Sequence, residues 1–408
     1  MKILVLGRGL PGPGQPLLGI FEYQQARALA AAGHEVVYGA LDIRFLHHRR
    51  PWGIRRMDLD GVHVVELSLP LGRLQYRGGY RLVRGLWGLL YRACVRAHGH
   101  PDVVHSHFVG WSAAAALAKP AHGYPLVVTE HTSGLMAPNP PRRMLRGISI
   151  AYAAADVLIA VSPALARRIR ELTGHDAVYV PNLVDTGTFA AVHPAPRPGH
   201  LVTVGNLIER KRVDVLLEAV ACLAAAGRPE LTLTVVGTGP ERAALQARAQ
   251  ALGIADRVTF TGGLEQRAIA ELLASAAAFA LASREETFGV VLIEAMAAGV
   301  PVVSTRSGGP DGFVTAATGV LTGFSAQELA DGLAQALGRD WDRETIRDYA
   351  VRHHSPAVIA ARLIELYETA VARWRGTAGR PAPHGEPAPP GEPAPPGEPA
   401  PHGEPEPR

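Results

Sequence analysis

Short apolar runs alternate with segments of helical periodicity along this chain, and the alternation occurs twice. The first series covers residues 1 to about 190 and contains KILVLG, HEVVYGA, VHVVELS, DVVHSHF, PLVVTEH, VLIAVS and AVYVPN. The second contains HLVTVGN, LTLTVVG, RVTFTG, AFALAS and PVVST. Apolar runs separated by helices are typical of parallel strands that helices cover on both faces. The pattern predicts two α/β domains that face each other across a cleft, where such folds usually bind their ligand.

The boundaries between these parts follow from composition. The proline-rich stretch HPAPRPG indicates a linker over 194–199, between a first domain over 1–193 and a second over 200–355. The segment PAVIAARLIELYETAVARW has apolar residues at helical spacing, which predicts a helix over 356–375. Beyond it GEPAPP recurs without apolar residues, so we expect 376–408 to be a disordered tail.

Charge and cysteine content limit the class of protein. The formal net charge of +4 and the pI of about 9.2 favour anionic small molecules or an anionic membrane surface, and no nucleic-acid-binding module is apparent. Cys94 and Cys222 are far apart and without metal-ligand spacing, which fits a reducing compartment. No signal segment is apparent, and no apolar run approaches the roughly 20 residues that span a bilayer. We therefore expect a cytoplasmic protein.

The first strand leads into a G-x-G-x-x-G string formed by Gly7, Gly9 and Gly12. In a dinucleotide-binding fold such a string opens a helix at once, whereas here three closely spaced prolines follow and the first convincing helix begins near Gly19. Asp42, which closes the next apolar run, keeps a dehydrogenase as an alternative interpretation. The long loop argues against it.

The most informative stretch is SREETFGVVLIEAMAAGVPVVSTRSGGPDGFV, Ser283–Val314. It follows the apolar run AFALAS and predicts a helix with Thr287 as N-cap that continues to about Ala298, with Gly299 as C-cap and a proline just beyond.

The start of this helix is a candidate anion site. The free amides of Phe288, Gly289 and Val290 would face the carboxyl edge of the sheet, which suits a diphosphate. Glu286 and Glu294 form E-x7-E, with one carboxylate at the helix mouth and the other about two turns inside it. Carboxylates at these positions suit a sugar ligand, because they accept hydrogen bonds from its hydroxyls. A solvated helix end with glutamates near its positive dipole is the alternative.

At this point the chain resembles a known family. Ser283–Val314 is similar to the signature of the retaining glycosyltransferases of the GT-B fold, in the large family 4 of E-x7-E type, also called glycosyl transferases group 1. Supporting segments are GHEVV, PDVVHSHF, VVTEHTSG, ADVLIAVSPAL, VYVPNLVDTGTF, VGNLIERKRVDVLLEAV, VVGTGPERAAL and VTFTGGL. The resemblance covers about residues 1–374. It implies two Rossmann-like domains, acceptor-side first and nucleotide-sugar-binding second, with a C-terminal helix that crosses back to the first.

The resemblance assigns roles in the second domain. Glu294 would hold the ribose hydroxyls, and Glu286 with the three amides would hold the transferred sugar and the diphosphate. Lys211 would neutralise the leaving diphosphate, which needs a cation or a metal. Gly237 and Gly239 would form part of the wall near the nucleotide.

In the first domain the resemblance places His107 near the sugar and the anomeric centre, as a catalytic residue with Glu286 and Lys211. His131 would be a second cleft histidine that contributes to donor binding. From the residues alone, a pair of strand-end histidines satisfied by backbone groups is the favoured interpretation. Gly19 would let the backbone approach a donor phosphate or the acceptor.

This sequence departs from the family pattern at two positions. Asn206 stands where members often have an arginine that binds phosphate, and whether Arg210 replaces that arginine is open. Leu183 stands where the usual PNG turn has glycine.

Two weaker signals have competing interpretations. Asp58 and Asp60 form D-x-D, which a metal site could use, but the Asp-Gly turn signal favours a hairpin. From Gly72 to His98 arginines recur at helical spacing, which fits either a basic face on anionic lipid or an ordinary domain helix with a solvated face.

The expected activity is transfer of a hexose, with retention, from a UDP- or GDP-sugar to a glycan, lipid-linked or small-molecule hydroxyl in bacterial polysaccharide or glycoconjugate assembly. We expect no cofactor and no catalytic metal, no nucleic-acid partner, and at most peripheral contact with the inner membrane. A catalytically silent nucleotide-sugar-binding or assembly partner of the same fold is the alternative.

Overall fold

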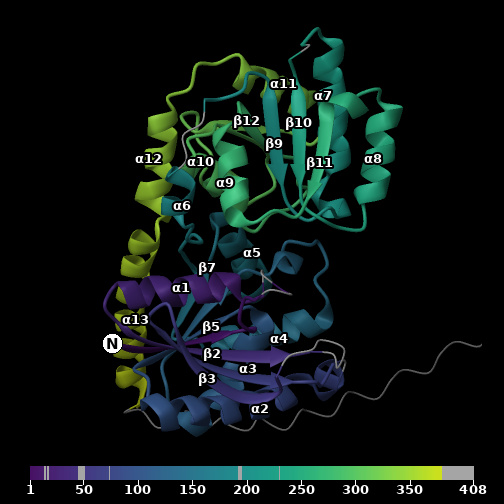
Figure 1. Ribbon diagram of the computed structural model, residues 1–408. Coiled ribbons are helices and arrows are strands. Elements are labelled where there is room, and N and C mark those ends of the chain that lie inside the picture. Colours follow the sequence, from purple (N-terminus) through teal and green to yellow (C-terminus); the bar gives the residue numbers. More distant parts are fainter. Residues whose placement is uncertain are drawn as a thin grey trace, which may run out of the picture.

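The computed structural model describes residues 1–12, 15, 18–44, 51–72, 74–191, 195–228 and 230–378, without the side chains of 74–78 and 377–378. Two α/β domains lie one above the other, each built around its own sheet (Figure 1). The predicted tail lies outside the described residues, apart from its first three positions, which extend the last helix to Ala378.

The N-terminal sheet has the strand order β3-β4-β2-β1-β5-β6-β7-β8. All neighbours pair in parallel except β3 and β4, which form an antiparallel hairpin. The strands are β1 Lys2–Gly7, β2 Glu35–Ile43, β3 Gly53–Leu59, β4 Val62–Leu69, β5 Val103–His107, β6 Leu126–Glu130, β7 Val157–Ala160 and β8 Val178–Tyr179.

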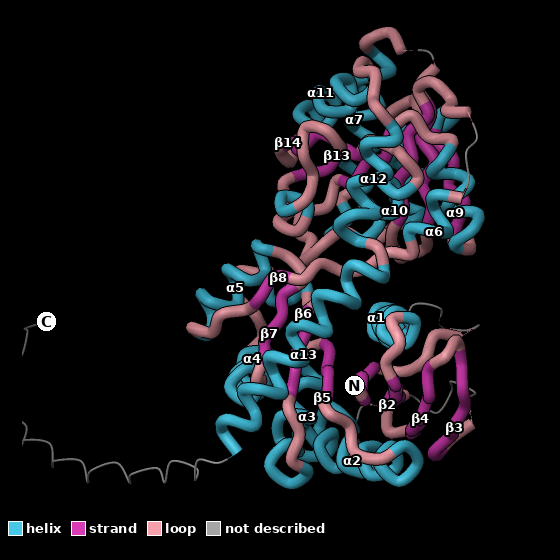
Figure 2. The backbone as a smooth tube through the Cα atoms, turned by 90° about the vertical axis from the view of Figure 1, so that its left-hand side faces the viewer, coloured by secondary structure: helices cyan, strands magenta, loops and turns pink. Residues whose placement is uncertain are grey.

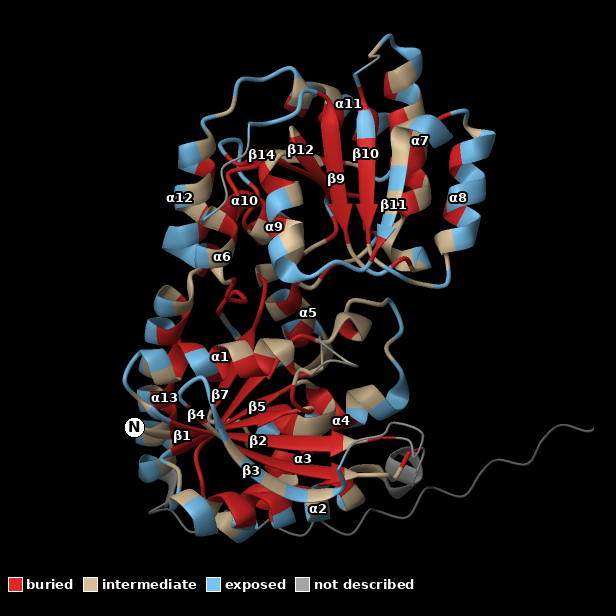
Figure 3. Cartoon of the chain, viewed as in Figure 1, coloured by how far each residue is buried: buried red, intermediate tan, exposed pale blue. Residues whose placement is uncertain are grey.

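Helices cover both faces of this sheet, and the central strands are almost fully buried (Figure 3). These helices are α1 Ile20–Ala31, α2 Leu74–His98, α3 Val109–His122, α4 Arg142–Ala154 and α5 Pro163–Thr173. The first helix begins where the sequence predicted, directly after Gly19.

The C-terminal sheet is entirely parallel and has the order β11-β10-β9-β12-β13-β14. Its strands are β9 His200–Val204, β10 Thr232–Val236, β11 Val258–Gly262, β12 Ala278–Leu281, β13 Val302–Thr305 and β14 Gly319–Thr322. Its helices are α7 Val213–Ala225, α8 Arg242–Ala251, α9 Gln266–Ala274, α10 Val290–Ala297, α11 Ala326–Leu337 and α12 Arg343–His354.

Every apolar run that the sequence offered as a strand forms one, so the prediction of two parallel-sheet domains is confirmed. Two strands were not among those runs. Strand β3 is half exposed and carries three charged residues, and β14 has only four residues. Edge strands with little buried apolar surface have too weak a hydrophobic pattern to be recognised from sequence alone.

The D-x-D stretch forms a hairpin, as its turn signal predicts. Asp60 has a positive φ of 52° in the turn between β3 and β4, and Asp58 lies on β3 beside His63. Because β4 runs parallel to β2, its first residues lie at the amino edge of the sheet. The hairpin turn is thus at the edge opposite the carboxyl ends of the parallel strands.

The chain crosses between the domains earlier than the predicted linker. Helix α6, Thr186–Ala190, packs against α9, α10 and α12 of the second domain, so the crossing precedes it. Residue 194 of the predicted linker is outside the described residues. The return crossing follows α12, where helix α13, Pro356–Ala378, runs down to pack against α1 of the first domain (Figure 2).

No helix within the described part of the chain is long and apolar enough to cross a membrane.

Candidate active site

Strand order determines where each domain can bind a ligand. In the second domain, β9 has β10 on one side and β12 on the other, and in the first domain β1 similarly lies between β2 and β5. A crevice forms outside the carboxyl ends of two strands whose connections lead in opposite directions. The loops after β9 and β12, and those after β1 and β5, are therefore the candidate ligand-binding loops.

In the second domain these loops bring Lys211 and Glu286 into contact. The Lys211 ammonium donates a 2.5 Å hydrogen bond to Glu286 Oε1, to which the Ser283 hydroxyl also donates at 2.6 Å. Glu286 is buried, and its backbone is fixed by Ser307 O and by the amide of Gly309, each at 2.8 Å. Two residues that sequence reasoning named as catalytic, 75 positions apart, thus form one ion pair.

Arg210 lies close to this ion pair. Its Nη1 donates to the Glu285 carbonyl at 2.7 Å and is 4.0 Å from Glu286 Oε2. The backbone carbonyl of Arg210 in turn accepts from the amide of Arg284 at 2.9 Å. Arg210 therefore places a second cation close to the Glu286 carboxylate.

Helix α10 begins two residues later than predicted. Its N-cap is Gly289, whose φ of 96° and ψ of 55° are left-handed, and not Thr287. Residues 284–289 remain outside the helix because Glu286 pairs with the 307–309 loop. No described residue accepts a hydrogen bond from the amide of Phe288, Gly289 or Val290, as expected for the first turn of a helix.

The end of α10 agrees with the prediction more closely. Gly299 has a φ of 75° and donates to Met296 O, while Val300 donates to Ala295 O. These two bonds form a Schellman motif, with glycine at the position that requires a left-handed backbone.

Glu294, the second carboxylate of E-x7-E, has a different environment from Glu286. No hydrogen bond or ion pair joins its side chain to any described residue, and it is partly exposed. Burial raises its pKa from 4.5 to about 7. Glu294 therefore offers an accessible carboxylate without a protein partner.

A small pocket lies between the carboxyl ends of β9, β10 and β12. Asn206 and Lys211 contribute to its lining together with eight further residues: Thr203, Val204, Gly205, Leu207, Val213, Val235, Val236 and Leu281. The side chain of Lys211 thus reaches both this pocket and Glu286.

The glycines of GTGP have a structural reason in this wall. A Cβ on Gly237 would lie 1.9 Å from Gly205 O, and one on Gly239 would lie 2.2 Å from Leu207 O. Both glycines therefore allow the β10 loop to pack directly on the β9 loop that carries Lys211. Their predicted contact with a nucleotide stays a prediction.

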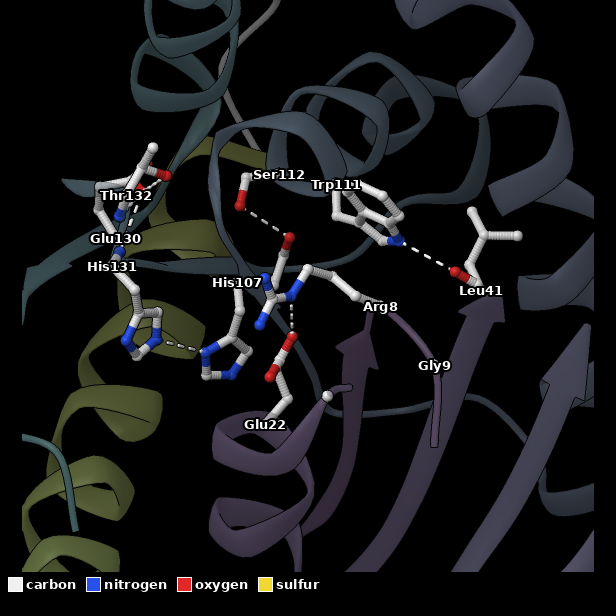
Figure 4. Close-up of polar contacts among 12 residues, drawn as sticks. Arg8, Gly9, Glu22, Leu41, His107, Trp111, Ser112, Glu130, His131 and Thr132 are labelled. Carbon is white, nitrogen blue, oxygen red and sulfur yellow. Dashed lines mark hydrogen bonds and ion pairs between the residues drawn. The ribbon is translucent and has the colours of Figure 1, made fainter. Parts of the chain in front are cut away.

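In the first domain His107 and His131 contact each other. His107 Nδ1 and His131 Nε2 are 3.0 Å apart, and the other nitrogen of each ring is buried without a hydrogen-bond partner (Figure 4). Burial is the main cause that lowers the pKa of His107 well below its ordinary range and that of His131 to about 3. Burial therefore keeps both imidazoles neutral at pH 7.

His105 shows what a structural histidine looks like in the same strand. Its Nδ1 is 2.7 Å from the Tyr367 hydroxyl of α13, and its Nε2 is 2.7 Å from the Thr129 hydroxyl. Both ring nitrogens are satisfied, so His105 fixes α13 to the sheet. The unsatisfied nitrogens of His107 set it apart from this neighbour.

Sequence reasoning missed an ion pair beside these histidines. Arg8 Nε donates to Glu22 Oε1 at 2.8 Å, and its guanidinium lies 3.5 Å from the centre of the Phe108 ring. Glu22 is fully buried on α1, in a stripe with Gln25, Ala26 and Leu29. A glutamate at 3–4 spacing with buried apolar residues needs a cation, so this spacing could have predicted that Glu22 is paired, but not that its partner is Arg8.

Asp42, which the dehydrogenase interpretation would use for ribose, is buried in an ion pair with Arg44. That interpretation also required the glycine string to open a helix, and α1 starts only after Gly19. The structure therefore does not favour a dinucleotide site here.

Gly19 has a left-handed backbone with φ 68°, and a Cβ there would lie 2.2 Å from Gly9 O and 2.7 Å from the Tyr38 hydroxyl. The packing of its own loop is thus sufficient to require glycine at this position. Backbone approach to a ligand remains a prediction.

The two halves of the site are joined through the 307–312 loop. A Cβ on Gly308 would lie 3.2 Å from Met136 Cε, and one on Gly312 would lie 2.9 Å from Pro163 Cδ. Met136 belongs to the segment that follows His131, and Gly308 pairs with Glu286. The loop that fixes Glu286 therefore also contacts the first domain.

Comparison with known proteins identifies the class. A family model described as "Glycosyltransferase Family 4" matches residues 20–188, and one described as "Glycosyl transferases group 1" matches residues 189–353. The phosphatidyl-myo-inositol mannosyltransferase of Mycobacterium tuberculosis is 33% identical over 299 residues, 67% of this chain and 75% of that protein. The D-inositol 3-phosphate glycosyltransferase of Actinosynnema mirum is 33% identical over 303 residues, 65% and 71%.

Solved structures show the same fold. Sucrose-phosphate synthase from Thermosynechococcus elongatus aligns with a TM-score of 0.73 at 20% identity, covering 91% of this chain and 99% of that one. Anabaena HepE in complex with UDP aligns with a TM-score of 0.66 at 20% identity, covering 90% and 100%. The two facing domains are those of the GT-B fold. The chain belongs to the glycosyltransferases, in the family whose two halves are glycosyltransferase family 4 and glycosyl transferases group 1.

Proposed function

We propose that this protein is a retaining glycosyltransferase that moves a hexose from a UDP- or GDP-sugar to a hydroxyl of a glycan, a lipid-linked or a small-molecule acceptor. The assignment as a transferase rests on the family. The proposal of a nucleotide-sugar donor is supported by Anabaena HepE, which binds UDP in its solved structure. The inositol compounds in the names of two relatives, and the lipopolysaccharide core in that of a third, fit an acceptor from bacterial glycoconjugate assembly.

The observation that carries the proposal is the pairing of Lys211 with Glu286 next to the unpaired amides that start α10. A diphosphate at these amides would meet the positive end of the helix and the Lys211 ammonium together. Arg210, close to the same carboxylate, would add positive charge that Asn206 lacks. With two cations, Lys211 and Arg210, the site can stabilise the leaving group without a metal. We therefore also propose that the reaction needs no catalytic metal.

Glu294 would hold the nucleotide. Its carboxylate has no protein partner, and a carboxylate accepts hydrogen bonds from paired ribose hydroxyls. The sugar would then extend from the amides toward Glu286 and, across the cleft, toward His107.

In the mechanism we propose, no side chain acts as nucleophile. The leaving diphosphate takes the proton of the acceptor hydroxyl on the face from which it departs, and the site contributes positioning and charge stabilisation. His107 is neutral at pH 7 and can donate or accept one hydrogen bond at the sugar, which suits orientation better than charge stabilisation.

We further propose a cytoplasmic location with peripheral contact at the inner membrane. Helix α2 exposes Arg81, Arg84, Arg92 and Arg96, and the first domain buries the opposite face around Trp87 and Tyr91. The side chains of Arg73 and Arg77 are outside the described residues. A solvated basic face without membrane contact is the other outcome, and binding to anionic and neutral vesicles separates the two.

Thermal unfolding with UDP, GDP or NAD, each with and without EDTA, tests the proposed function first. A ligand at about 100 times its Kd adds roughly 2.7 kcal/mol of stability. We expect a shift with UDP or GDP that EDTA does not abolish. A shift with NAD alone would contradict the proposal, and the anomeric configuration of a transfer product, measured by NMR, tests retention.

A further inference from the structure

The Arg8–Glu22 ion pair has a geometry that the proposed donor site does not use. Glu22 is fully buried, whereas the Arg8 side chain keeps 28% of its surface exposed. Solvent, and any ligand in the crevice, therefore meets the cationic member of the pair and not the carboxylate. A buried carboxylate needs a cation as its partner. A fully buried arginine would meet that need equally well, so the pairing with Glu22 does not explain why Arg8 is partly exposed.

The guanidinium of Arg8 is held on two sides. Its Nε is committed to Glu22, and its flat face lies on the Phe108 ring. No described residue accepts a hydrogen bond from Nη1 or Nη2, so the outer edge of the fork is unoccupied. A guanidinium fixed in this way offers parallel N–H donors that match a carboxylate or a phosphate.

The backbone of Phe108 has an unusual conformation that places its ring against Arg8 and His131. Phe108 has φ 60° and ψ 143°, a region that non-glycine residues rarely adopt. Its amide donates to Thr129 O at 3.1 Å, which helps to hold it there. In this conformation the ring contacts Arg8 and also stacks on His131, with ring centres 4.8 Å apart.

The position of Arg8 places it at the crevice of the first domain. Arg8 follows β1 directly and His107 ends β5, the two strands at which the strand order reverses. Figure 4 shows Arg8 beside His107, with Glu22 on the α1 side of the guanidinium. Since both histidines are neutral at pH 7, Arg8 supplies the positive charge of this cluster.

We propose that Arg8, held by Glu22 and Phe108, is an oxyanion-binding residue that selects substrates carrying a carboxylate or phosphate group on the first-domain side of the site. Such a group can belong to the acceptor or to the transferred sugar, and the chemistry of recognition is the same. This inference rests on the proposed function, because it names a property of the substrates of that reaction. Glu22 acts through Arg8 and is a positioning residue.

The test compares small anions with uncharged counterparts on the full chain. The probes are methyl phosphate and glucuronate, with methanol and glucose as counterparts, and binding is measured by saturation-transfer NMR with and without saturating UDP. Saturating UDP blocks the diphosphate site, so that an anion bound there is not counted. We expect both anions, and neither counterpart, to bind the wild-type chain in the presence of UDP.

Three variants assign that binding. Arg8→Gln should weaken it about tenfold or more, the usual effect of losing a charge-assisted hydrogen bond. Because Arg8→Gln leaves Glu22 buried and unpaired, the double variant Arg8→Gln/Glu22→Gln provides a neutral pair that keeps the fold and should show the same loss. Arg27→Gln removes a charge from an exposed pair with Asp60 and should change nothing. Equal anion binding by wild type and both Arg8 variants would overturn the proposal.

A second arm identifies the source of the anionic group. If the group is on the transferred sugar, wild type binds UDP-glucuronate more tightly than UDP-glucose and the Arg8 variants lose that preference. If it is on the acceptor, the preference for the two donors is the same in all variants, while methyl phosphate binding still depends on Arg8. Absence of UDP and GDP binding to wild type would refute the proposed function, and Arg8-dependent anion binding without UDP would still support this subsite.

Discussion

The two halves of the site differ in the charged groups that they contain. In the second domain Lys211 lines a pocket and pairs with Glu286, Arg210 lies near the same carboxylate, and the carboxylate of Glu294 is left without a partner among the described residues. In the first domain burial keeps two histidines neutral, and the Arg8 guanidinium beside them is paired with the buried Glu22 carboxylate. In the function we propose, the second domain receives the charged diphosphate, and Arg8 in the first domain helps to orient the substrate.

The largest test of this contrast is the removal of the Lys211 ammonium. Lys211→Met should lower the rate of sugar transfer by about 10²–10³-fold, the usual cost of losing one electrostatic stabiliser of the transition state. The measurement is kcat with a labelled donor. Arg248→Met, which removes a cation from an exposed pair with Glu218, is the matched control and should keep wild-type activity. A variant with full activity would show that Lys211 does not stabilise the leaving group.

On the other side of the cleft we expect a loss of stability. Arg8→Gln leaves the fully buried Glu22 carboxylate without its cation, which should cost about 3 kcal/mol of unfolding free energy in urea titrations. Arg27→Gln, in an exposed pair, should cost less than about 1 kcal/mol. The double variant Arg8→Gln/Glu22→Gln should recover most of the loss. Equal stability of Arg8→Gln and Arg27→Gln would contradict the view that Arg8 stabilises the fold by neutralising the buried Glu22.

The raised pKa of Glu294 makes the stability of the chain depend on pH. Its pKa in the folded chain, about 7, lies above the 4.5 expected when unfolded, so the folded state holds the proton more tightly. Stability from this group is present in acid and is lost as the pH rises from about 4.5 to 7. Glu294→Gln should therefore stabilise the chain at pH 8 by about 1–3 kcal/mol and have little effect at pH 4, in urea titrations at both values.

The same variant should weaken nucleotide binding at pH 8, because a ribose would lose its ionised acceptor. In wild type the affinity for UDP or GDP should fall as the pH drops through 7, and in Glu294→Gln it should fall by less, because only the terminal phosphate of the nucleotide then titrates, as measured by calorimetric titration. The same change in affinity between pH 6 and pH 8 in wild type and in Glu294→Gln would refute the assigned role.

The smallest effect concerns the backbone contact behind Glu286. A Cβ on Gly309 would lie 2.5 Å from the amide nitrogen of Phe288, so Gly309→Ala should displace the start of α10 and cost about 1–3 kcal/mol together with donor affinity. Gly85→Ala adds a methyl group in open space within α2 and should instead stabilise the chain by about 0.5–1 kcal/mol. Thermal unfolding of the two variants measures both signs. Stabilisation by Gly309→Ala would show that the loop has room to move.

How far the sequence predicts the site differs between the domains for a physical reason. In the second domain, E-x7-E and ERKR are local patterns on loops that follow strong strands, so both ends of the Lys211–Glu286 pair were named. In the first domain, Arg8 is one arginine in a glycine-rich loop, and the spacing of Glu22 on its helix indicates a cationic partner without identifying it. Only the fold shows that the two are 2.8 Å apart and that one is fully buried.

Local errors have the same origin. Thr287 has the composition of an N-cap, yet the helix starts at Gly289 because a loop 20 residues later pairs with Glu286 and keeps that segment extended. The crossing point was predicted from proline content, whereas the contacts of α6 with α9, α10 and α12 decided it. Such long-range contacts leave no periodic signal in the chain.

The sequence by itself determined two parallel-sheet domains, the order of their strands along the chain, the start of α1, and the residues of the E-x7-E stretch, because burial of apolar runs and the conformational preferences of glycine and proline act locally. The tertiary structure decided which side chains meet: which carboxylate of E-x7-E is paired, which histidines have an unsatisfied nitrogen, and that Arg8 pairs with Glu22. These outcomes depend on burial and on contacts between distant segments, where desolvation makes an ion pair, or the lack of one, decisive.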